Sequence, residues 1–178
     1  MKISAFLIVV GLVSMLTACQ SCKKQVEPTT LPPETQTGAN TFACKVNGSL
    51  WLPNGRANQF SGNLRAIYDE TFQGGNLSIS AYSEKDKTKV SIQVSSNMNS
   101  VGEYEYSMPN GSIAFLYSDL RLNCVWETDN KNNSLSQGKV IITKLDKFSR
   151  IISGTFYFTI ENSCGKIEVT DGRFDLKF

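Results

Sequence analysis

Histidine is absent from all 178 residues of the chain. Ser-His-Asp and Cys-His nucleophile systems, HExxH zinc motifs and metal sites with imidazole ligands are therefore excluded. The chain also lacks an excess of either charge, because 18 basic and 16 acidic side chains leave a net charge of +2. Without clustered lysine and arginine to displace counterions from phosphates, we expect no nucleic-acid partner.

Long apolar runs are missing too, apart from residues 3–16 near the start of the chain. About fourteen apolar positions fall short of the roughly 20 that a membrane-spanning helix needs, so residues 1–18, with Lys2 ahead of the run, are predicted to be an export signal. Leu16-Thr17-Ala18-Cys19 resembles a bacterial lipobox. We therefore expect cleavage before Cys19 and a lipid anchor with palmitate-like acyl chains on it. An ordinary secretory signal followed by a chance cysteine is the alternative.

Residues 19–40 are rich in Pro, Thr, Glu and Gln, which predicts a disordered tether between the lipidated cysteine and a folded domain. A redox role for the Cys19-x-x-Cys22 spacing is not expected, because a lipidated Cys19 has no free thiol. Gln20, directly after Cys19, is not the aspartate that would resemble an inner-membrane retention signal, so we expect transfer to the outer membrane. Lipoproteins exported to the cell surface resemble one another in an acidic run soon after the cysteine. Lys23 and Lys24 are basic, which favours the periplasmic face over the cell surface.

Helical periodicity is nearly absent after residue 18, whereas a period of two runs from residue 41 to the C-terminus. Asn47-Gly48 between two alternating runs is a strong hairpin signal. The pattern predicts one all-β domain over residues 41–178: an antiparallel β-sandwich of about ten short strands, with a closed or partly open barrel as the alternative. Residues 139–178 are expected to form a meander, with Phe178 docked.

Several short motifs lie near the two ends of this domain: Thr41-Phe42-Ala43-Cys44-Lys45-Val46-Asn47-Gly48, Ile142-Thr143-Lys144-Leu145-Asp146, Ile151-Ile152-Ser153-Gly154-Thr155-Phe156 and Asp171-Gly172-Arg173-Phe174-Asp175. Together they resemble a family of uncharacterised lipoprotein domains common in Bacteroidota. The resemblance implies a cell-envelope location and a β-sandwich, and it implies no activity.

Catalytic chemistry has few candidates in this sequence. Three carboxylate pairs have the residue types of a glycosidase: Asp69 with Glu70, Glu103 with Glu105, and Asp171 with Asp175. Each is flanked by polar or turn residues, which is typical of a solvated strand face or hairpin end. Residues 129–133 lack the glycine and distal glutamate of a calcium loop and read as a hairpin tip. We therefore predict no catalytic residue, no metal site and no cofactor.

Aromatic side chains give the one positive indication of binding. Tyr82 and Tyr157 lie on strand faces otherwise made of serine and threonine, where an aromatic ring has no core to fill. They are the candidate binding aromatics, although single exposed aromatics are common. Trp126 and Trp51 are expected in the core and at its edge.

Two classes of function follow. The first is a membrane-anchored cell-envelope lipoprotein whose non-catalytic domain binds a protein or a glycan. The second is a small carboxylate-based glycan hydrolase, disfavoured by the missing histidine and the modest size of the domain.

Three cysteines lie in the domain, and an odd number leaves at least one thiol unpaired. The predicted meander places Cys124 and Cys164 at the same end of the fold. We expect a disulfide between them and a buried thiol at Cys44.

Overall fold

The computed structural model describes residues 29–106 and 112–178. The predicted signal peptide, Cys19 and Cys22 lie outside the described residues. Within the described ranges the chain forms thirteen strands and no helix. These ranges therefore contain no helix long and apolar enough to cross a membrane.

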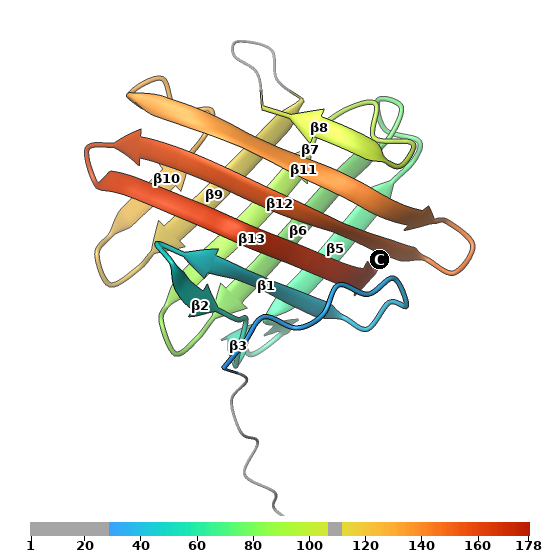
Figure 1. Cartoon of the computed structure of the whole chain (residues 1–178), viewed down its shortest axis with the longest axis horizontal. Coiled ribbons are helices and arrows are strands. Elements are labelled where there is room, and N and C mark those ends of the chain that lie inside the picture. Colours follow the sequence, from blue (N-terminus) through green and yellow to red (C-terminus); the bar gives the residue numbers. More distant parts are fainter. Residues whose placement is uncertain (1–28, 107–111) are drawn as a thin grey trace, which may run out of the picture.

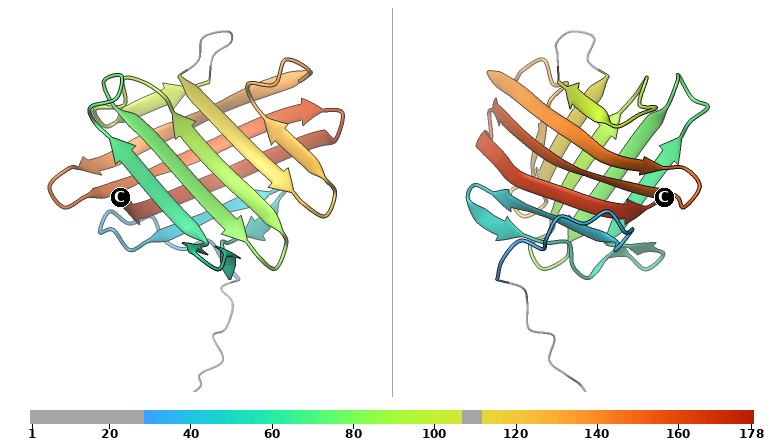
Figure 2. Two further views of the ribbon diagram at one scale, coloured as in Figure 1. Left: turned by 180° about the vertical axis from the view of Figure 1, so that it is seen from behind. Right: turned by 45° about the vertical axis from the view of Figure 1, so that its right-hand side comes forward.

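Two large antiparallel sheets face one another with their strands crossing at an angle (Figures 1 and 2). The six-stranded sheet has the order β2 (Ser49–Trp51), β1 (Thr41–Val46), β13 (Gly165–Lys177), β12 (Ile151–Asn162), β11 (Leu135–Asp146) and β8 (Gly102–Glu105). The five-stranded sheet has the order β10 (Cys124–Glu127), β9 (Ile113–Asp119), β7 (Thr88–Val94), β6 (Asn76–Ser83) and β5 (Leu64–Asp69). A small hairpin of β3 (Arg56–Asn58) and β4 (Ser61–Gly62) forms a third, two-stranded sheet.

The predicted sandwich is confirmed, since the strands belong to separate sheets and not to the single closed sheet of the alternative. The prediction of short strands is wrong for β11, β12 and β13, which are 12, 12 and 13 residues long. Each pairs with its chain neighbour, as the predicted meander requires. Bulges between Ile142 and Lys144 and between Phe156 and Phe158 interrupt the pairing of these strands, and an interrupted alternation predicts shorter strands than the chain forms.

Alternating apolar residues on both sheets point inward and form one core. The largest fully buried side chains include Phe115, Phe158, Leu77, Ile79 and Ile92. Trp126 and Trp51 are buried as well, as predicted. The rings of Phe115 and Phe158, from opposite sheets, stack with centroids 5.1 Å apart and tie the two layers together.

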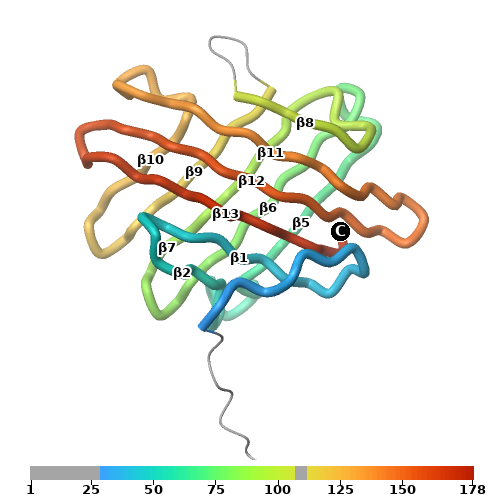
Figure 3. The backbone as a smooth tube through the Cα atoms, in the orientation of Figure 1, coloured from blue at the N-terminus to red at the C-terminus, as the bar shows by residue number. Residues whose placement is uncertain are grey.

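The two ends of the domain lie side by side in the six-stranded sheet, where β1 pairs with β13 (Figure 3). Asn47 and Gly48 both have positive φ, at 48° and 80°, which is the turn geometry that the hairpin signal predicted. Phe178 is docked: its N–H donates to the carbonyl of Arg150, and its ring contacts that of Tyr68.

A disulfide joins Cys124 on β10 to Cys164 in the β12–β13 turn, the pair that the sequence predicted. It links the edge of the five-stranded sheet to the six-stranded sheet. Two hydrogen bonds reinforce this junction, from Trp126 Nε1 to the carbonyl of Gly165 (2.8 Å) and from Asn162 Nδ2 to that of Val125 (2.9 Å). Cys44 is a buried free thiol, and burial raises its pKa.

Candidate binding groove on the six-stranded sheet

A buried carboxylate on β13 organises the region around the groove. Asp175 is 1% exposed, and its oxygens accept six hydrogen bonds from the following donors: Thr35 Oγ1 (2.6 Å), Thr37 N (2.9 Å) and Oγ1 (3.3 Å), Gly38 N (2.8 Å), Ala39 N (3.1 Å) and Ser153 Oγ (2.8 Å). Burial raises the pKa of this carboxyl, but the hydrogen bonds outweigh burial and hold the pKa well below its ordinary value. The carboxylate is therefore charged at neutral pH and fixes the chain that surrounds it.

This arrangement corrects two predictions. The sequence predicts a disordered tether over residues 19–40, yet residues 35–39 are bound to the sheet through Asp175. Asp175 belongs to a carboxylate pair for which the sequence predicts a solvated strand face or hairpin end, but it is buried beneath that segment. Its side chain does point to the outer face of the sheet, but the segment covers this part of the face.

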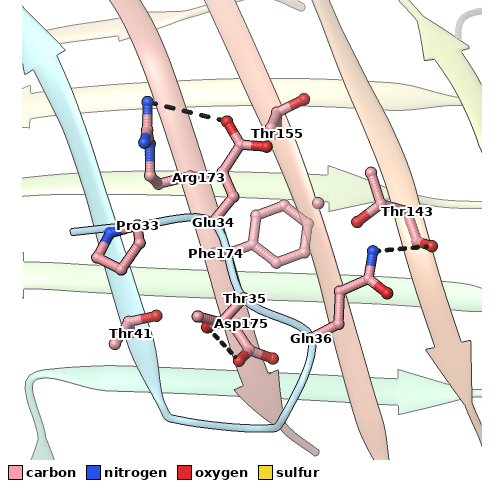
Figure 4. A pocket seen from close by; sticks show the side chains of 11 residues that line it. Pro33, Glu34, Thr35, Gln36, Thr41, Thr143, Thr155, Arg173, Phe174 and Asp175 are labelled. Atoms are coloured by element: carbon pink, nitrogen blue, oxygen red, sulfur yellow. Dashed lines mark hydrogen bonds and ion pairs between the residues drawn. The ribbon is translucent and has the colours of Figure 1, made fainter. Parts of the chain in front are cut away.

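The covering segment makes one wall of a pocket of about 270 Å³ on the outer face of β11, β12 and β13 (Figure 4). Gln36 reaches across to β11, where its Nε2 donates to the carbonyl of Thr143 (3.5 Å). Lys144 Nζ donates in return to the carbonyl of Gln36 (2.9 Å). Thr155 on β12 and Asp175 on β13 line the pocket as well.

A second hollow of about 290 Å³ continues along the same face. It shares Glu34, Thr155 and Arg173 with the first, so the two form one shallow channel, here called the groove. Tyr157, 45% exposed, lines the second hollow and gives the groove an aromatic wall.

Charged side chains along the groove are already paired. Arg173 Nη2 lies 3.9 Å from Glu34 Oε1, and its Nη1 donates to the carbonyl of Pro32 (3.1 Å). Lys139 Nζ lies 2.7 Å from a carboxylate oxygen of both Glu103 and Glu105, and these hydrogen bonds raise the pKa of Lys139. The groove therefore presents hydroxyl, amide and ring surfaces more than a free charge of either sign.

Tyr82, the other candidate binding aromatic, lies elsewhere. It is on β6, and its side chain alternates with the inward-pointing Ala81 and Ser83, so it belongs to the outer face of the five-stranded sheet. Tyr157 is on the outer face of the opposite sheet. The two tyrosines therefore form no common platform, and only Tyr157 adjoins a groove.

Each of the three candidate carboxylate pairs makes structural contacts. Glu70 lies 2.9 Å from Lys147 Nζ, and Asp69 accepts hydrogen bonds from Thr71. Glu103 and Glu105 share Lys139. Asp171 Oδ2 is 2.9 Å from Lys45 Nζ, whereas the oxygens of its partner Asp175 are saturated with donors. Across the described ranges, no three His, Cys, Asp or Glu side chains are grouped as a metal site would require.

Sequence reasoning found Tyr157 but missed the groove. Its walls need residues 33–36 and 139–175 to meet, and an irregular segment has no periodicity from which to predict that contact. Asp175 gave no signal of this contact, because it alternates with Phe174 and Leu176 as an ordinary solvent-facing acid on an amphipathic strand does.

An all-β sandwich with a polar groove on one outer face is thus the class of protein that these observations define. The chain belongs to the family described as Domain of unknown function (DUF6252), which matches residues 40–175. No curated protein and no solved structure matches the chain.

Proposed function

We propose that this protein is a lipid-anchored, non-catalytic component of the bacterial cell envelope that binds a glycan in the groove. The Leu16-Thr17-Ala18-Cys19 motif, which resembles a lipobox, supports the anchor, and the motifs that resemble those of lipoprotein domains in Bacteroidota support the phylum. Gln20, with Lys23 and Lys24 after it, supports the periplasmic face of the outer membrane.

The observation that carries the choice of ligand is the position of Tyr157. Its half-exposed ring lines the same hollow as Thr155, while the nearby charges are paired within the protein. A ring face stacks on the apolar face of a sugar, and hydroxyl and amide groups satisfy its hydroxyls. A strongly charged ligand would have to displace the ion pairs of Arg173 or Lys139, so a neutral glycan fits better.

Binding of the full chain, solubilised in detergent, to an array of neutral hexose and N-acetylhexosamine oligosaccharides tests this function. We expect retention of one glycan class, and loss of that retention in Tyr157→Ala. Tyr82→Ala is the matched control, because it removes the same ring from the opposite face and should bind as the parent does.

Failure of every glycan on the array to bind would overturn the proposal, and so would equal binding by Tyr157→Ala and the parent. Both variants should keep the parent melting temperature to within a few degrees, because neither tyrosine belongs to the buried core.

A further inference from the structure

Strand β5 is the longest of the four strands that end the two sheets. It has six residues, whereas the edge strands β2, β8 and β10 have three, four and four. An edge strand leaves a row of N–H and C=O groups without strand partners. The length of β5 makes it the edge best able to pair with another strand.

The pairing of β5 with β6 determines which backbone N–H and C=O groups of this edge are free. Tyr82 N donates to the carbonyl of Asn63 (2.7 Å), and the register continues from Leu64 opposite Ala81 to Asp69 opposite Asn76. Odd-numbered residues of β5 therefore direct their N–H and C=O groups toward β6. The N–H and C=O groups of Leu64, Ala66 and Tyr68 point away from β6, and no hydrogen bond to them is present in the part of the chain that the structure describes.

Side chains on β5 alternate in the same way. Leu64, Ala66 and Tyr68 pack against the core, whereas Arg65, Ile67 and Asp69 are exposed on the outer face, with Ile67 at 43%. Exposed charges often protect an edge strand from pairing. On β5, however, the cation Arg65 and the anion Asp69 each lie two residues from Ile67, one on either side.

Such a sequence is complementary to itself. If a second β5 lay antiparallel to the first, with Ile67 opposite Ile67, each Arg65 would face Asp69 of the other copy. The same register places Ala66 opposite Tyr68, so that the free N–H and C=O groups of both strands meet as hydrogen-bonded pairs. Shifting the register by one residue in either strand would turn these groups away from one another and separate the opposite charges.

Both charged groups are available for such a contact. Arg65 makes no ion pair with any described residue. Asp69 binds Thr71 and Phe72 through Oδ1, which leaves Oδ2 without a hydrogen bond in the described structure. Exposed apolar side chains adjoin the strand, with Phe72 in the turn after it and Phe148 next to Lys147, which pairs with Glu70 (2.9 Å).

We propose that β5 is a homodimer interface, where two copies pair antiparallel about a two-fold axis at Ile67 and join their five-stranded sheets into one continuous sheet. The contact is isologous, so it closes at two copies. The groove lies on the other sheet and stays open in each copy. A six-residue edge is a small interface, and confinement of both copies to one membrane, which rests on the proposed lipid anchor, would raise their effective concentration.

Disulfide trapping tests the interface in the full chain within its own membrane. The background is Cys22→Ser, and one cysteine is added per variant. Ile67→Cys should give a band at twice the chain mass after mild oxidation, because directly opposite Cβ atoms are about 4.5–5.5 Å apart, near the separation that a disulfide needs. Ser78→Cys is the matched control: it is the neighbour of Ile67 on β6, and its distance from the same residue of the other copy would be about 14 Å.

The register is tested with two differently tagged chains in the same cells. Arg65→Cys should cross-link to Asp69→Cys and not to a second Arg65→Cys. Equal cross-linking of Ile67→Cys and Ser78→Cys, or cross-linking of Arg65→Cys with itself as strong as with Asp69→Cys, would overturn the proposal. Glycan binding is measured separately, so a failed groove and a failed interface give different results.

Discussion

Gly154 on β12 and Phe174 on β13 lie directly opposite one another, and the ring of Phe174 occupies the space that a side chain at position 154 would need. A Cβ on Gly154 would lie 2.8 Å from Cζ of Phe174 and would also meet the carbonyl oxygen of Ile141. The next pair repeats this relationship in reverse, since Phe156 lies opposite Gly172 and covers it. The motifs at residues 151–156 on β12 and 171–175 on β13 therefore pack against one another beneath the groove.

Gly154→Ala should lower the free energy of unfolding by about 1–3 kcal/mol, because the added methyl group overpacks the sheet and cannot avoid a backbone oxygen. Chemical denaturation monitored by tryptophan fluorescence measures the change. Gly62→Ala is the control, because a Cβ there meets nothing closer than 4.0 Å. Equal stability of the two variants would show that the ring of Phe174 moves aside at little cost.

Loss of the disulfide should lower the melting temperature. Cys124 and Cys164 are 40 residues apart, and on the chain-entropy model closing such a loop stabilises the fold by about 3–4 kcal/mol. Cys124→Ala and Cys164→Ala should destabilise the domain alike, and the double variant should lose no more than either single one. Additive losses, measured by calorimetry without reductant, would contradict a shared bond.

Much of the fold could be predicted because alternation is a local property. The runs around Ile79 and Ile92, the Asn47-Gly48 turn and the C-terminal meander all follow from a period of two and from turn residues. The pairing of Cys124 with Cys164 could also be predicted, because the meander fixes the end of the sheet at which each strand finishes.

Contacts between distant segments could not be predicted in this way. The bond between Thr35 and Asp175 joins residues 140 positions apart, and neither flanking segment has a periodicity that implies the other. The exposure of Asp175 could not be predicted for the same reason. Alternation correctly assigns its side chain to the outer face of the sheet, but it does not indicate that residues 35–39 cover that part of the face. Tyr82 and Tyr157 looked equivalent because the sequence does not say to which sheet a strand belongs.

The proposed lipidation of Cys19 predicts that replacing this cysteine blocks processing of the chain. In Cys19→Ala, the chain should accumulate as an uncleaved precursor, because the lipoprotein signal peptidase requires the modified cysteine. Immunoblotting and mass spectrometry of the membrane fraction would detect the retained residues 1–18. Processing that continues at the normal site, and that globomycin does not inhibit in the parent, would contradict the lipid anchor.

Acid should loosen the segment that Asp175 holds. The pKa of this carboxyl is lower in the folded chain than its unfolded value of about 3.9, so its contribution to stability is fully present above that value and is lost as the pH falls toward the folded pKa. The parent should therefore lose stability below about pH 4.

Asp175→Asn should cost about 2–3 kcal/mol at neutral pH, because an amide offers one acceptor oxygen where the carboxylate offered two, and its NH₂ group faces other donors. The difference from the parent should shrink as the pH falls below 4, since the parent carboxylate is then being protonated. Asp171→Asn is the matched control on the same strand: its ion pair with Lys45 is roughly half exposed, so its loss should cost less than about 1 kcal/mol. Limited proteolysis supplies the second measurement, because only Asp175→Asn should expose residues 33–39 to cleavage at neutral pH. A difference between Asp175→Asn and the parent that is constant from pH 7 to pH 2 would show that the carboxylate charge does not hold this segment.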